Sequence, residues 1–416
     1  MWTSRTKMAL PCTYPWINRV AVTLWLSVCT SAVDLRVDNP DSIRDAAATI
    51  AYGLQSMYNG NQTGGELGKF PDPPYYWWLS GAAWGGMVDY YLYTGDASYY
   101  NVTHDALVSQ ISDTYDYLPE AEKLEEGNDD IALWAFAALT AAEYGLRDPP
   151  APYPTWFEIC DNIFNDYVSR WIESSNTCGG GLKWQVFPTI AGYDYKNSIS
   201  NGGFLQLAAR LARFSNNQTY YDWAKRVWDW SVTVGLIDTS CNVFDGSDDK
   251  INCTAIDHTL WSYNVAVYLY GTAVLYNYTN GSDLWANRTN GLLGFALQTF
   301  VSPFPNATDI LYEHCELSWN CNIDQYSFRA YLARWLAKTT IMMPETTGEV
   351  ATVLQASSLA AAEVCTGGED GTTCGARWYL DGWDGTSGLG QALSALEMVQ
   401  SLLVTHAGPP KKRAPT

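Results

Sequence analysis

The sequence predicts an all-α fold, an (α/α)6 barrel of six helical hairpins in a single domain. Three observations predict it: apolar residues recur at helical spacing, short and long connections alternate along the chain, and two kinds of helix alternate with them. Apolar residues at i, i+3, i+4 and i+7 give a helix one face for a core, and strand-like alternation is scarce. No Pro- or Ser-rich linker divides the chain, so we expect one domain over residues 34–405.

We expect twelve helices, numbered here in chain order. They cover residues 40–58, 75–94, 97–117, 129–145, 152–174, 198–214, 217–235, 257–278, 281–301, 322–341, 345–365 and 386–404. Each even-numbered helix is followed closely by the next, whereas a long loop rich in Gly, Asp, Asn and aromatic residues follows each odd-numbered helix. Six hairpins with their long loops at one end form a closed ring.

Composition assigns the two kinds of helix to two layers. Even-numbered helices are apolar nearly all round and carry small residues, as in Ser80–Gly86, whereas odd-numbered helices are one-sided, as in Tyr221–Trp230. A helix that is apolar all round is buried and an amphipathic one lies outside, so the even-numbered helices are expected to form the inner ring. The alternative is an open helical solenoid, which would lack this contrast.

The first 33 residues have the order of a secretory signal peptide. Arg5, Lys7 and Arg19 precede an apolar run, and small residues follow it up to Val33. A retained signal anchor is the alternative, although the apolar run is short for a bilayer. We expect a secreted protein whose residues 406–416 form a disordered tail, and that tail has no apolar segment of the kind that signals a lipid anchor.

Cysteine and asparagine patterns agree with secretion. Eight cysteines follow the predicted signal peptide, an even number that an oxidising compartment favours. Their spacing predicts four local disulfides, Cys160–Cys178, Cys241–Cys253, Cys315–Cys321 and Cys365–Cys374. The alternative, a metal site, lacks any C-x-x-C or His-paired spacing, so no metal is expected. Glycosylation sequons begin at Asn61, Asn101, Asn217, Asn252, Asn277, Asn280, Asn287 and Asn306.

Charge and aromatic content narrow the class of ligand. The formal net charge is −20, which disfavours binding to nucleic acid or to an anionic membrane surface. Aromatic residues make up 14% of the chain. Aromatic rings can stack on the C–H faces of sugars while carboxylates bind their hydroxyls, so this composition favours a carbohydrate ligand.

The barrel predicts where a site should lie. All inner helices begin at one rim, where the long loops and the positive helix ends build a concave floor. The segments that precede the inner helices are rich in acids, amides and aromatic residues, with one arginine, Arg329. They contain no Cys–His or Ser–His–Asp arrangement, so hydrolysis of an acetal by two carboxylates fits them best.

Asp129 and Asp130 are the candidate pair for this chemistry. The alternative is a simple helix N-cap, because Asn128 and both acids come immediately before an apolar helix. Neighbours within a helix face different ways, so we expect one of the two to keep extended dihedrals and both to reach the cavity. Two close carboxylates cannot both ionise easily, so the pKa of one rises, while the helix N-terminus keeps the other anionic. That division suits a retaining glycosidase.

Four segments resemble glycoside hydrolase family 76, and in particular its fungal cell-wall branch, the Dcw/Dfg proteins. They are Trp77–Trp84, Glu126–Trp134, Asn201–Gly203 and Leu260–Asn264, and the resemblance extends over essentially the whole mature chain. It implies a barrel without a cofactor that cleaves α-1,6-linked mannose internally with retention, with Asp129 as nucleophile and Asp130 as general acid/base. For the fungal branch it also implies a transglycosylase at the cell wall or the outer face of the plasma membrane. Such an enzyme would cleave the mannose core of a GPI-anchor glycan and pass the anchored protein to a β-glucan acceptor.

Further rim residues are candidate substrate contacts, and we expect a monomer. The candidates are Trp78, Trp134, Trp261, Tyr263 and Trp383 for stacking, and Asn128, Asn201, Asn264, Asp257 and Asp384 for hydroxyl groups. The tryptophans could equally be core and the asparagines helix caps. His258 is a candidate for substrate contact or for packing, and Arg329 is expected to pair with an acid.

Three other functions remain open at this stage. The first is a transglycosylase with negligible hydrolysis, and the second is a non-catalytic glycan-binding wall protein on the same barrel. The third, a polysaccharide lyase, would need a Tyr/His or Arg/Lys site for uronic acids, which the acidic rim disfavours.

Overall fold

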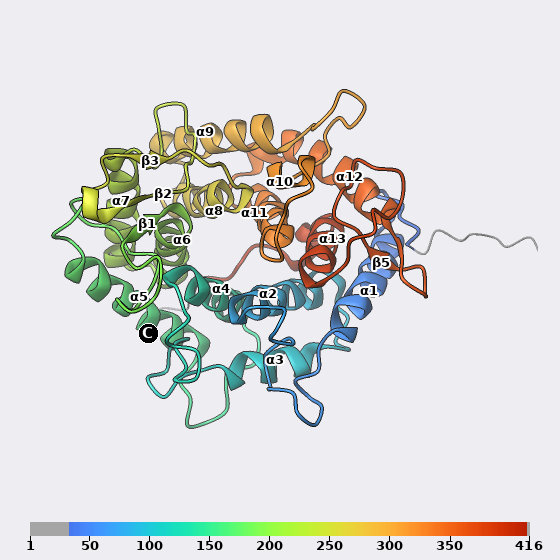
Figure 1. The fold of residues 1–416 in the computed structure, drawn as a ribbon, viewed down its shortest axis with the longest axis horizontal. Coiled ribbons are helices and arrows are strands. Elements are labelled where there is room, and N and C mark those ends of the chain that lie inside the picture. Colours follow the sequence, from blue (N-terminus) through green and yellow to red (C-terminus); the bar gives the residue numbers. More distant parts are fainter. Residues whose placement is uncertain (1–32, 414–416) are drawn as a thin grey trace, which may run out of the picture. The chain divides into compact units, whose positions relative to one another are not determined.

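The computed structural model describes residues 33–413, so the predicted signal peptide lies outside these residues except for Val33. Its helices form two concentric layers (Figure 1). The inner layer consists of α2 (Trp77–Thr94), α4 (Asn128–Tyr144), α6 (Ser198–Ser215), α8 (Ser262–Tyr278), α11 (Phe328–Met342) and α13 (Leu389–Ser401). The outer layer consists of α1 (Pro40–Ser56), α3 (Tyr100–Ser109), α5 (Trp156–Glu173), α7 (Gln218–Val234), α9 (Asp283–Phe300) and α12 (Thr347–Glu363).

The inner helices form a closed ring. Each packs against the next along the chain, and α13 packs back against α2. The Gln400 side chain of α13 donates a hydrogen bond to the carbonyl of Gly86 in α2, at 3.1 Å. The predicted (α/α)6 barrel is therefore confirmed, and the open solenoid is excluded.

Small residues allow the inner helices to approach one another. A Cβ atom added at Gly81 of α2 would lie 2.5 Å from the indole of Trp134 in α4. Trp134 itself is completely buried and stacks on Trp77, with ring centroids 5.0 Å apart. A bulkier residue at this position would separate the two helices, which is why the apolar inner segments are rich in Gly and Ala.

Charged side chains buried among the inner helices are paired. Arg210 of α6 contacts Glu143 of α4 at 2.8 Å. Arg334 of α11 contacts Glu397 of α13 at 2.7 Å, and Lys338 contacts Asp89 of α2 at 2.8 Å. A buried charge is tolerated when it is paired and hydrogen-bonded, so these contacts fix neighbouring inner helices against each other.

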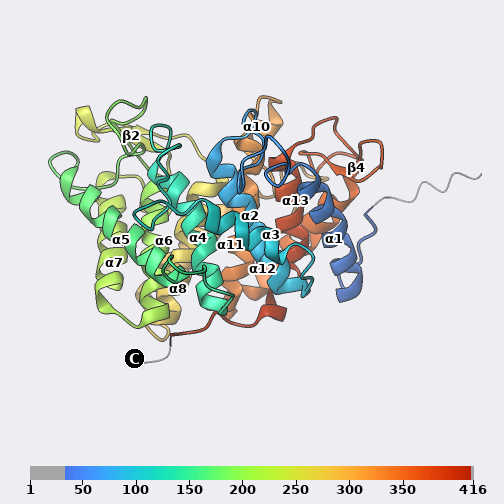
Figure 2. The same ribbon diagram turned by 90° about the horizontal axis from the view of Figure 1, so that it is seen from below.

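The long loops gather at one rim of the barrel. Figure 2 shows β2, α10 and β4 on this side and residues 404–413 on the opposite side. The rim carries two small antiparallel sheets, made of β1 (Tyr195–Asn197), β2 (Gly246–Asp248) and β3 (Ile256–Asp257), and of β4 (Cys365–Gly367) and β5 (Thr373–Cys374). It also carries α10 (His314–Leu317) and the 3-10 turns η1 (Asp249–Ile251) and η2 (Gln325–Ser327). Turns η3 (Pro344–Thr346) and η4 (Val404–Ala407) complete the elements.

Three predicted helices are shorter than expected by at least five residues at one end. The third was expected over residues 97–117 but ends at Ser109, because Ser112 and Asp116 form their own hydrogen-bonded turn. The eighth was expected from residue 257 but begins at Ser262, because residues 256–257 pair with β2 instead. The tenth was expected from residue 322, but α11 begins at Phe328, after the 3-10 turn η2.

The predicted disordered tail is wrong for residues 406–413. The backbone N–H of Lys411 donates to the carbonyl of Glu143 at 2.8 Å, and that of Arg413 donates to the carbonyl of Phe214 at 2.6 Å. The Arg213 side chain in turn donates to the carbonyl of Pro410. This segment therefore binds the C-terminal ends of α4 and α6, whose last carbonyl groups need partners.

Two of the four predicted disulfides are confirmed and two are wrong. Cys315–Cys321 and Cys365–Cys374 are bonded as predicted. Cys178 instead bonds Cys253, which lies 75 residues away, because the loop after α5 packs on the β2–β3 loop. Cys160 is a buried thiol on α5, and Cys241 is a half-buried thiol.

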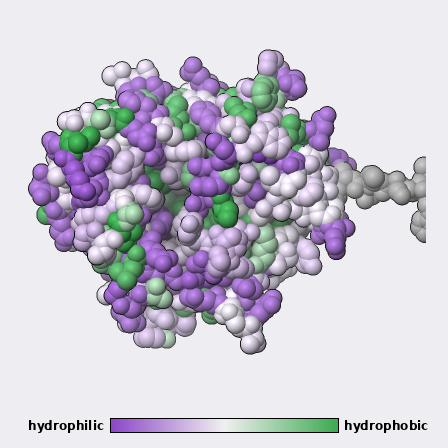
Figure 3. Space-filling view, viewed as in Figure 1, coloured by the Kyte–Doolittle hydropathy of each residue, from purple (hydrophilic) through white to green (hydrophobic). Residues whose placement is uncertain are grey.

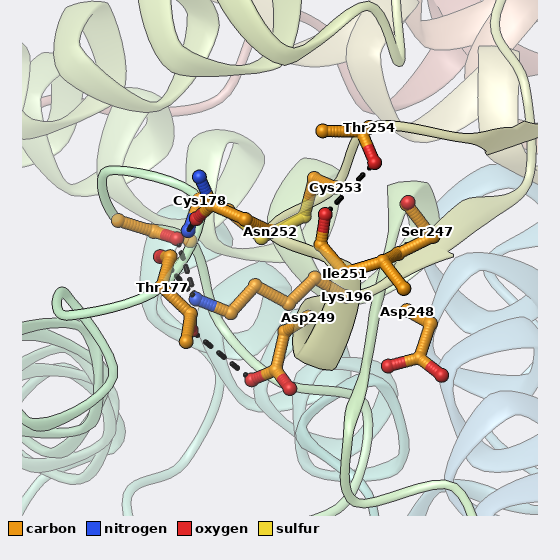
Figure 4. The surroundings of a disulfide bond; sticks show 12 residues. Thr177, Cys178, Lys196, Ser247, Asp248, Asp249, Ile251, Asn252, Cys253 and Thr254 are labelled. Atoms are coloured by element: carbon orange, nitrogen blue, oxygen red, sulfur yellow. Dashed lines mark hydrogen bonds between the residues drawn. A yellow bond between two sulfur atoms is a disulfide. The ribbon is translucent and has the colours of Figure 1, made fainter.

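Further polar contacts surround the Cys178–Cys253 bond (Figure 4). The buried ammonium of Lys196 donates to the carbonyls of Ser174, Thr177 and Gly180. The side-chain oxygen of Asn252 accepts a hydrogen bond from the N–H of Cys178. Sequence proximity could not reveal this pairing, because it depends on two rim loops meeting in space.

Within residues 33–413, no helix is long and apolar enough to cross a membrane.

Candidate active site

The predicted acid pair lies at the N-terminus of α4, on the rim that carries the long loops. Gly127 is the N-cap residue, with extended backbone, and its N–H donates to Oδ2 of Asp130 at 2.6 Å. A Cβ atom at Gly127 would lie 2.4 Å from Oδ1 of Asp129. A residue with a side chain would therefore collide with the carboxylate beside it.

Asp129 and Asp130 both lie within the first turn of α4. The expectation that one of them keeps extended dihedrals is therefore wrong, as is the interpretation of Asn128 as the cap, because Gly127 takes that position. Both acids nevertheless line the same cavity. They can do so because α4 begins at the cavity, so successive residues of its first turn border the opening from different sides.

The cavity has a volume of about 340 Å³ and opens at the rim. Figure 3, in the direction of Figure 1, shows a hollow near the centre of this face. Its lining comes from the ends of α2, α4, α6, α8 and α11 and from the loops beside them. The residues are Tyr76, Trp77, Trp78, Glu122, Glu125, Glu126, Asp129, Asp130, Leu133, Trp184, Gln185, Ile199, Tyr263, Asp324 and Phe328.

The two carboxylates have different surroundings. Asp129 accepts hydrogen bonds from the indole N–H of Trp184 at 3.1 Å and from the Ser200 hydroxyl at 3.4 Å. Burial raises the pKa of Asp129, and these donors counteract the rise. Burial and the charge of Asp129 together raise the pKa of Asp130 well above its ordinary value. The pair can therefore hold one proton, on Asp130, while Asp129 stays the more acidic partner.

Two further acids enclose the pair. Glu126 is 1% exposed, and neither of its carboxyl oxygens has a hydrogen-bond partner among the described residues. Burial, with the nearby charge of Asp130, raises the pKa of Glu126 to about 10. Burial also raises the pKa of Asp324 to about 6, although a hydrogen bond from the Trp78 side chain lowers it. Among residues 33–413, no cation forms an ion pair with Asp129 or Asp130, so the site is a cluster of acids of the kind typical of acid–base catalysis.

Four of the predicted site residues meet at the cavity: Asp129, Asp130, Trp78 and Tyr263. Tyr263 stacks on Phe328, with ring centroids 3.9 Å apart and an interplanar angle of 6°. Trp78 lies on the wall of α2. These two rings are the predicted stacking residues that a sugar in the cavity could contact directly.

Three predicted amide residues position rim loops instead of lining the cavity. Asn201 is fully buried and exchanges hydrogen bonds with the backbone of Leu182. Asn128 donates to the carbonyl of Lys183 at 2.8 Å. Both contacts hold the segment that presents Trp184 to Asp129. Asn264, also fully buried, donates to Asp245 at 3.1 Å.

The remaining candidates lie away from the cavity. Trp134 is completely buried behind Trp77, and Trp261 packs edge-on against Phe328.

Asp257 is exposed and accepts hydrogen bonds from Thr259, and His258 is exposed and packs on Phe244. Trp383 is 42% exposed, with its indole N–H bonded to the carbonyl of Thr386.

Asp384 forms a buried ion pair with Arg377 at 2.9 Å. Arg329 pairs with Glu316 at 3.0 Å, in the structural role expected of it.

Trp184 and Asp324 are cavity residues that the sequence did not single out. Trp184 lies in the long loop between α5 and α6, outside any helical pattern. A backbone bridge between Gly127 and Gln185 holds this loop beside α4, so the Trp184 indole can donate to Asp129. The one feature in the sequence that could have indicated Trp184 is its position, as a tryptophan in a long polar loop at the rim. Asp324 and Glu126 stood in segments already recognised as rim, but nothing in the sequence ranks one rim acid above another.

Within residues 33–413, no group of three or more His, Cys, Asp or Glu side chains is arranged to hold a metal ion.

Comparison with known proteins agrees with this geometry. The profile of glycosyl hydrolase family 76 matches residues 42–414. The chain belongs to this family. The family 76 relatives include the mannan endo-1,6-alpha-mannosidase DCW1 of Saccharomyces cerevisiae, which is 45% identical over 373 residues, covering 89% of this chain and 81% of that one. DCW1 of Candida glabrata is 44% identical over 386 residues, covering 92% and 84%.

A crystal structure of Dfg5 from Chaetomium thermophilum in complex with glucosamine superposes with a TM-score of 0.86, at 37% identity, covering 91% of this chain and 94% of that one. The resemblance to family 76 and to its Dcw/Dfg branch is therefore confirmed.

Proposed function

We propose that the chain is a retaining, endo-acting α-1,6-mannosidase and transglycosylase of the fungal cell wall. The observation that carries the proposal is the adjacent pair Asp129 and Asp130, which line one cavity in different electrostatic surroundings. A retaining glycosidase needs one carboxylate as nucleophile and one protonated carboxyl as acid. The names of the fungal relatives support mannan as the substrate class.

In the first step, a carboxylate oxygen of Asp129 bonds to the anomeric carbon of a mannose unit. The bond from that carbon to the glycosidic oxygen breaks, and the proton of Asp130 passes to the leaving oxygen. The Trp184 and Ser200 donors and the N-terminus of α4 favour the anionic form of Asp129 before the attack.

In the second step, the Asp130 carboxylate removes a proton from an incoming hydroxyl. The oxygen of that hydroxyl bonds to the anomeric carbon, and the ester bond to Asp129 breaks. Water as acceptor gives hydrolysis, and a sugar hydroxyl gives transfer. In the finer form of the proposal, the donor is the mannose core of a GPI-anchor glycan, the acceptor is wall β-glucan, and the protein acts outside the cell.

Product analysis on an α-1,6-manno-oligosaccharide tests the proposal. The wild type is compared with Asp129→Asn and Asp130→Asn, with and without a β-1,3-glucan oligosaccharide. Shorter mannosides that disappear in both variants establish hydrolysis by the pair, and products longer by acceptor units establish transfer. Unchanged turnover in either variant would contradict the assignment of roles.

The second candidate function is a non-catalytic glycan-binding wall protein on the same barrel. The aromatic walls made by Trp78 and by stacked Tyr263 and Phe328 favour it, since they need no chemistry to bind sugars. Binding without turnover by the wild type, on several mannosides, would support this function over the enzyme.

A further inference from the structure

Trp319 is an exposed tryptophan on the rim, outside the cavity already described. Its side chain is 63% exposed, and it lies in the short loop closed by the Cys315–Cys321 disulfide. Its φ angle is 57°, a left-handed conformation that bulky residues rarely adopt. Backbone strain is unfavourable, and where a structure retains it, it often marks a functional site.

One face of the Trp319 ring packs against a buried arginine. The guanidinium carbon of Arg377 lies 3.4 Å from the ring centroid, and Arg377 is 1% exposed. Arg377 is held by Asp384 at 2.9 Å and donates from Nε to the carbonyl of Glu316. A cation–π contact with a buried guanidinium fixes the indole in one orientation.

Asp384 therefore has a different role from the one the sequence suggested. Its carboxylate also accepts hydrogen bonds from the backbone N–H groups of Ala376 and Arg377 and from Thr386. It holds the arginine that lies against Trp319. The Trp319 ring is therefore held by three features: a disulfide that closes its loop, an ion pair beneath the arginine it contacts, and a left-handed backbone conformation.

The position of Trp319 connects it to the cavity. Asp324, which lines the cavity, lies five positions further along the chain, so the two Cα atoms lie at most about 18 Å apart. A ligand long enough to leave the cavity over this wall would pass near the ring. The strongly negative chain disfavours anionic ligands, and a rigid indole face suits the C–H face of a neutral sugar.

We infer that Trp319 is a stacking platform for a distant sugar unit of the glycan chain whose reacting unit occupies the cavity. This inference rests on the proposed action on glycans. A preformed platform binds with little loss of conformational entropy, so it would favour long chains over short ones. The donor mannan and the acceptor glucan share the pyranose chemistry that it recognises.

Kinetics on α-1,6-manno-oligosaccharides of increasing length test the platform. In Trp319→Ala, we expect KM for the longest substrates to rise about 3- to 10-fold, with kcat and the values for the shortest substrate unchanged. Trp319→Phe keeps a ring and should recover most of the loss. Tyr52→Ala removes an aromatic side chain that is 64% exposed on the outer helix α1 and is not part of the cavity lining, and it should change nothing.

A second arm distinguishes donor from acceptor. The concentration of β-1,3-glucan oligosaccharide that gives half-maximal transfer is measured with a short donor. A rise of this concentration in Trp319→Ala, with an unchanged donor KM, assigns the platform to the acceptor, and the reverse assigns it to the donor.

The outcomes that overturn the inference are separate from those that overturn the function. Identical parameters at all donor and acceptor lengths would show that the ring binds no sugar. An equal loss on short and long substrates with a lower unfolding temperature would show a structural role only. If the wild type has no turnover, calorimetric titration with the same oligosaccharides still applies: weaker binding of long chains by Trp319→Ala keeps the platform, and equal binding rejects it.

Discussion

Helix α4 carries acids with opposite surroundings near its two ends: Asp129 is half-buried at the cavity, and Glu143 is fully buried. Asp129 at its N-terminus binds only uncharged donors, and within residues 33–413 it forms no ion pair. Glu143, fourteen residues later and about 21 Å along the helix, is paired with Arg210 at 2.8 Å. The same contrast extends to the neighbouring inner helices, where Glu397 and Asp89 are also paired with cations.

The difference shows how one barrel separates function from stability. An acid paired with a cation holds two helices together, whereas an acid at the rim without such a partner can hold a proton and transfer it. A carboxyl group with a raised pKa lowers the stability of the fold near neutral pH. The protein retains such groups at the rim, which indicates that they serve function. The predictions below test this contrast.

The largest expected effect is on catalysis at the rim. Asp129→Asn should lower kcat/KM on α-1,6-manno-oligosaccharides by at least about 10³-fold, because it removes the nucleophile. Its unfolding temperature should equal or exceed that of the wild type, since the variant removes a negative charge from an acid cluster. A variant that keeps activity, or that unfolds at a much lower temperature, would place Asp129 among the structural acids.

The next effect is on stability at the other end of α4. Glu143→Ala should lower the free energy of unfolding by about 3–5 kcal/mol, because it leaves the Arg210 charge buried and unpaired. Urea unfolding measures the loss, and the activity of the folded fraction should stay within twofold of the wild type. The control, Glu143→Leu combined with Arg210→Met, should recover most of the stability. Loss of activity in the folded fraction would break the separation of the two ends.

The rim itself is held by a covalent link where the inner ring is held by ion pairs. Replacing Cys178 and Cys253 by Ser should lower the free energy of unfolding by about 2–4 kcal/mol, since the bond closes a long loop. Cys241→Ser should have little effect on the unfolding temperature. The opposite result, a large effect for Cys241 and a Cys241–Cys253 peptide on non-reducing mapping, would restore the local pairing that the sequence suggested.

The last effect depends on pH and is smallest near pH 5. The folded protein raises the pKa of Glu126 to about 10, through burial and the nearby charges of Asp130, Glu122 and Asp116, with Arg170 opposing them. Because the folded state binds this proton more tightly than the unfolded chain, its contribution is present below about pH 4 and is lost as pH rises towards 10. Glu126→Gln should therefore gain stability relative to the wild type above pH 5, by up to about 1.4 kcal/mol per pH unit.

Unfolding temperatures of both proteins between pH 5 and 9 measure this difference. Glu143→Gln is the matched control at the paired site, and it should be less stable than the wild type throughout. A constant difference between Glu126→Gln and the wild type would show that Glu126 is already ionised.

The fold could be predicted because its signal is local and repeated. The contrast between all-round apolar helices such as α4 and one-sided helices such as α7 is written in consecutive residues, and so is the alternation of loop lengths. The identity of the acid pair also came from consecutive residues. What failed was whatever depends on two loops meeting, such as the Cys178–Cys253 bond and the contact of Trp184 with Asp129.

The candidate binding residues show the same limit. Tryptophans and asparagines near an inner-helix N-terminus have the same sequence signature whether they face the cavity, as Trp78 does, or fix a loop, as Asn201 does. The difference lies in the partner, which comes from elsewhere in the chain. From the sequence alone, Asp384 is likewise indistinguishable from an acid that binds substrate; its ion pair with Arg377 becomes visible only in the structure.

Chemical rescue by azide tests the central claim most directly, the division of roles between Asp129 and Asp130. Asp129→Ala and Asp130→Ala are each supplied with sodium azide and an activated α-mannoside whose leaving group needs no acid. We expect Asp130→Ala to give the α-mannosyl azide, because azide attacks the Asp129 ester. Asp129→Ala should give the β-mannosyl azide, because azide attacks the substrate directly. The reverse assignment of anomers would exchange the two roles, and the absence of any azide product from both variants would contradict a double displacement at this pair.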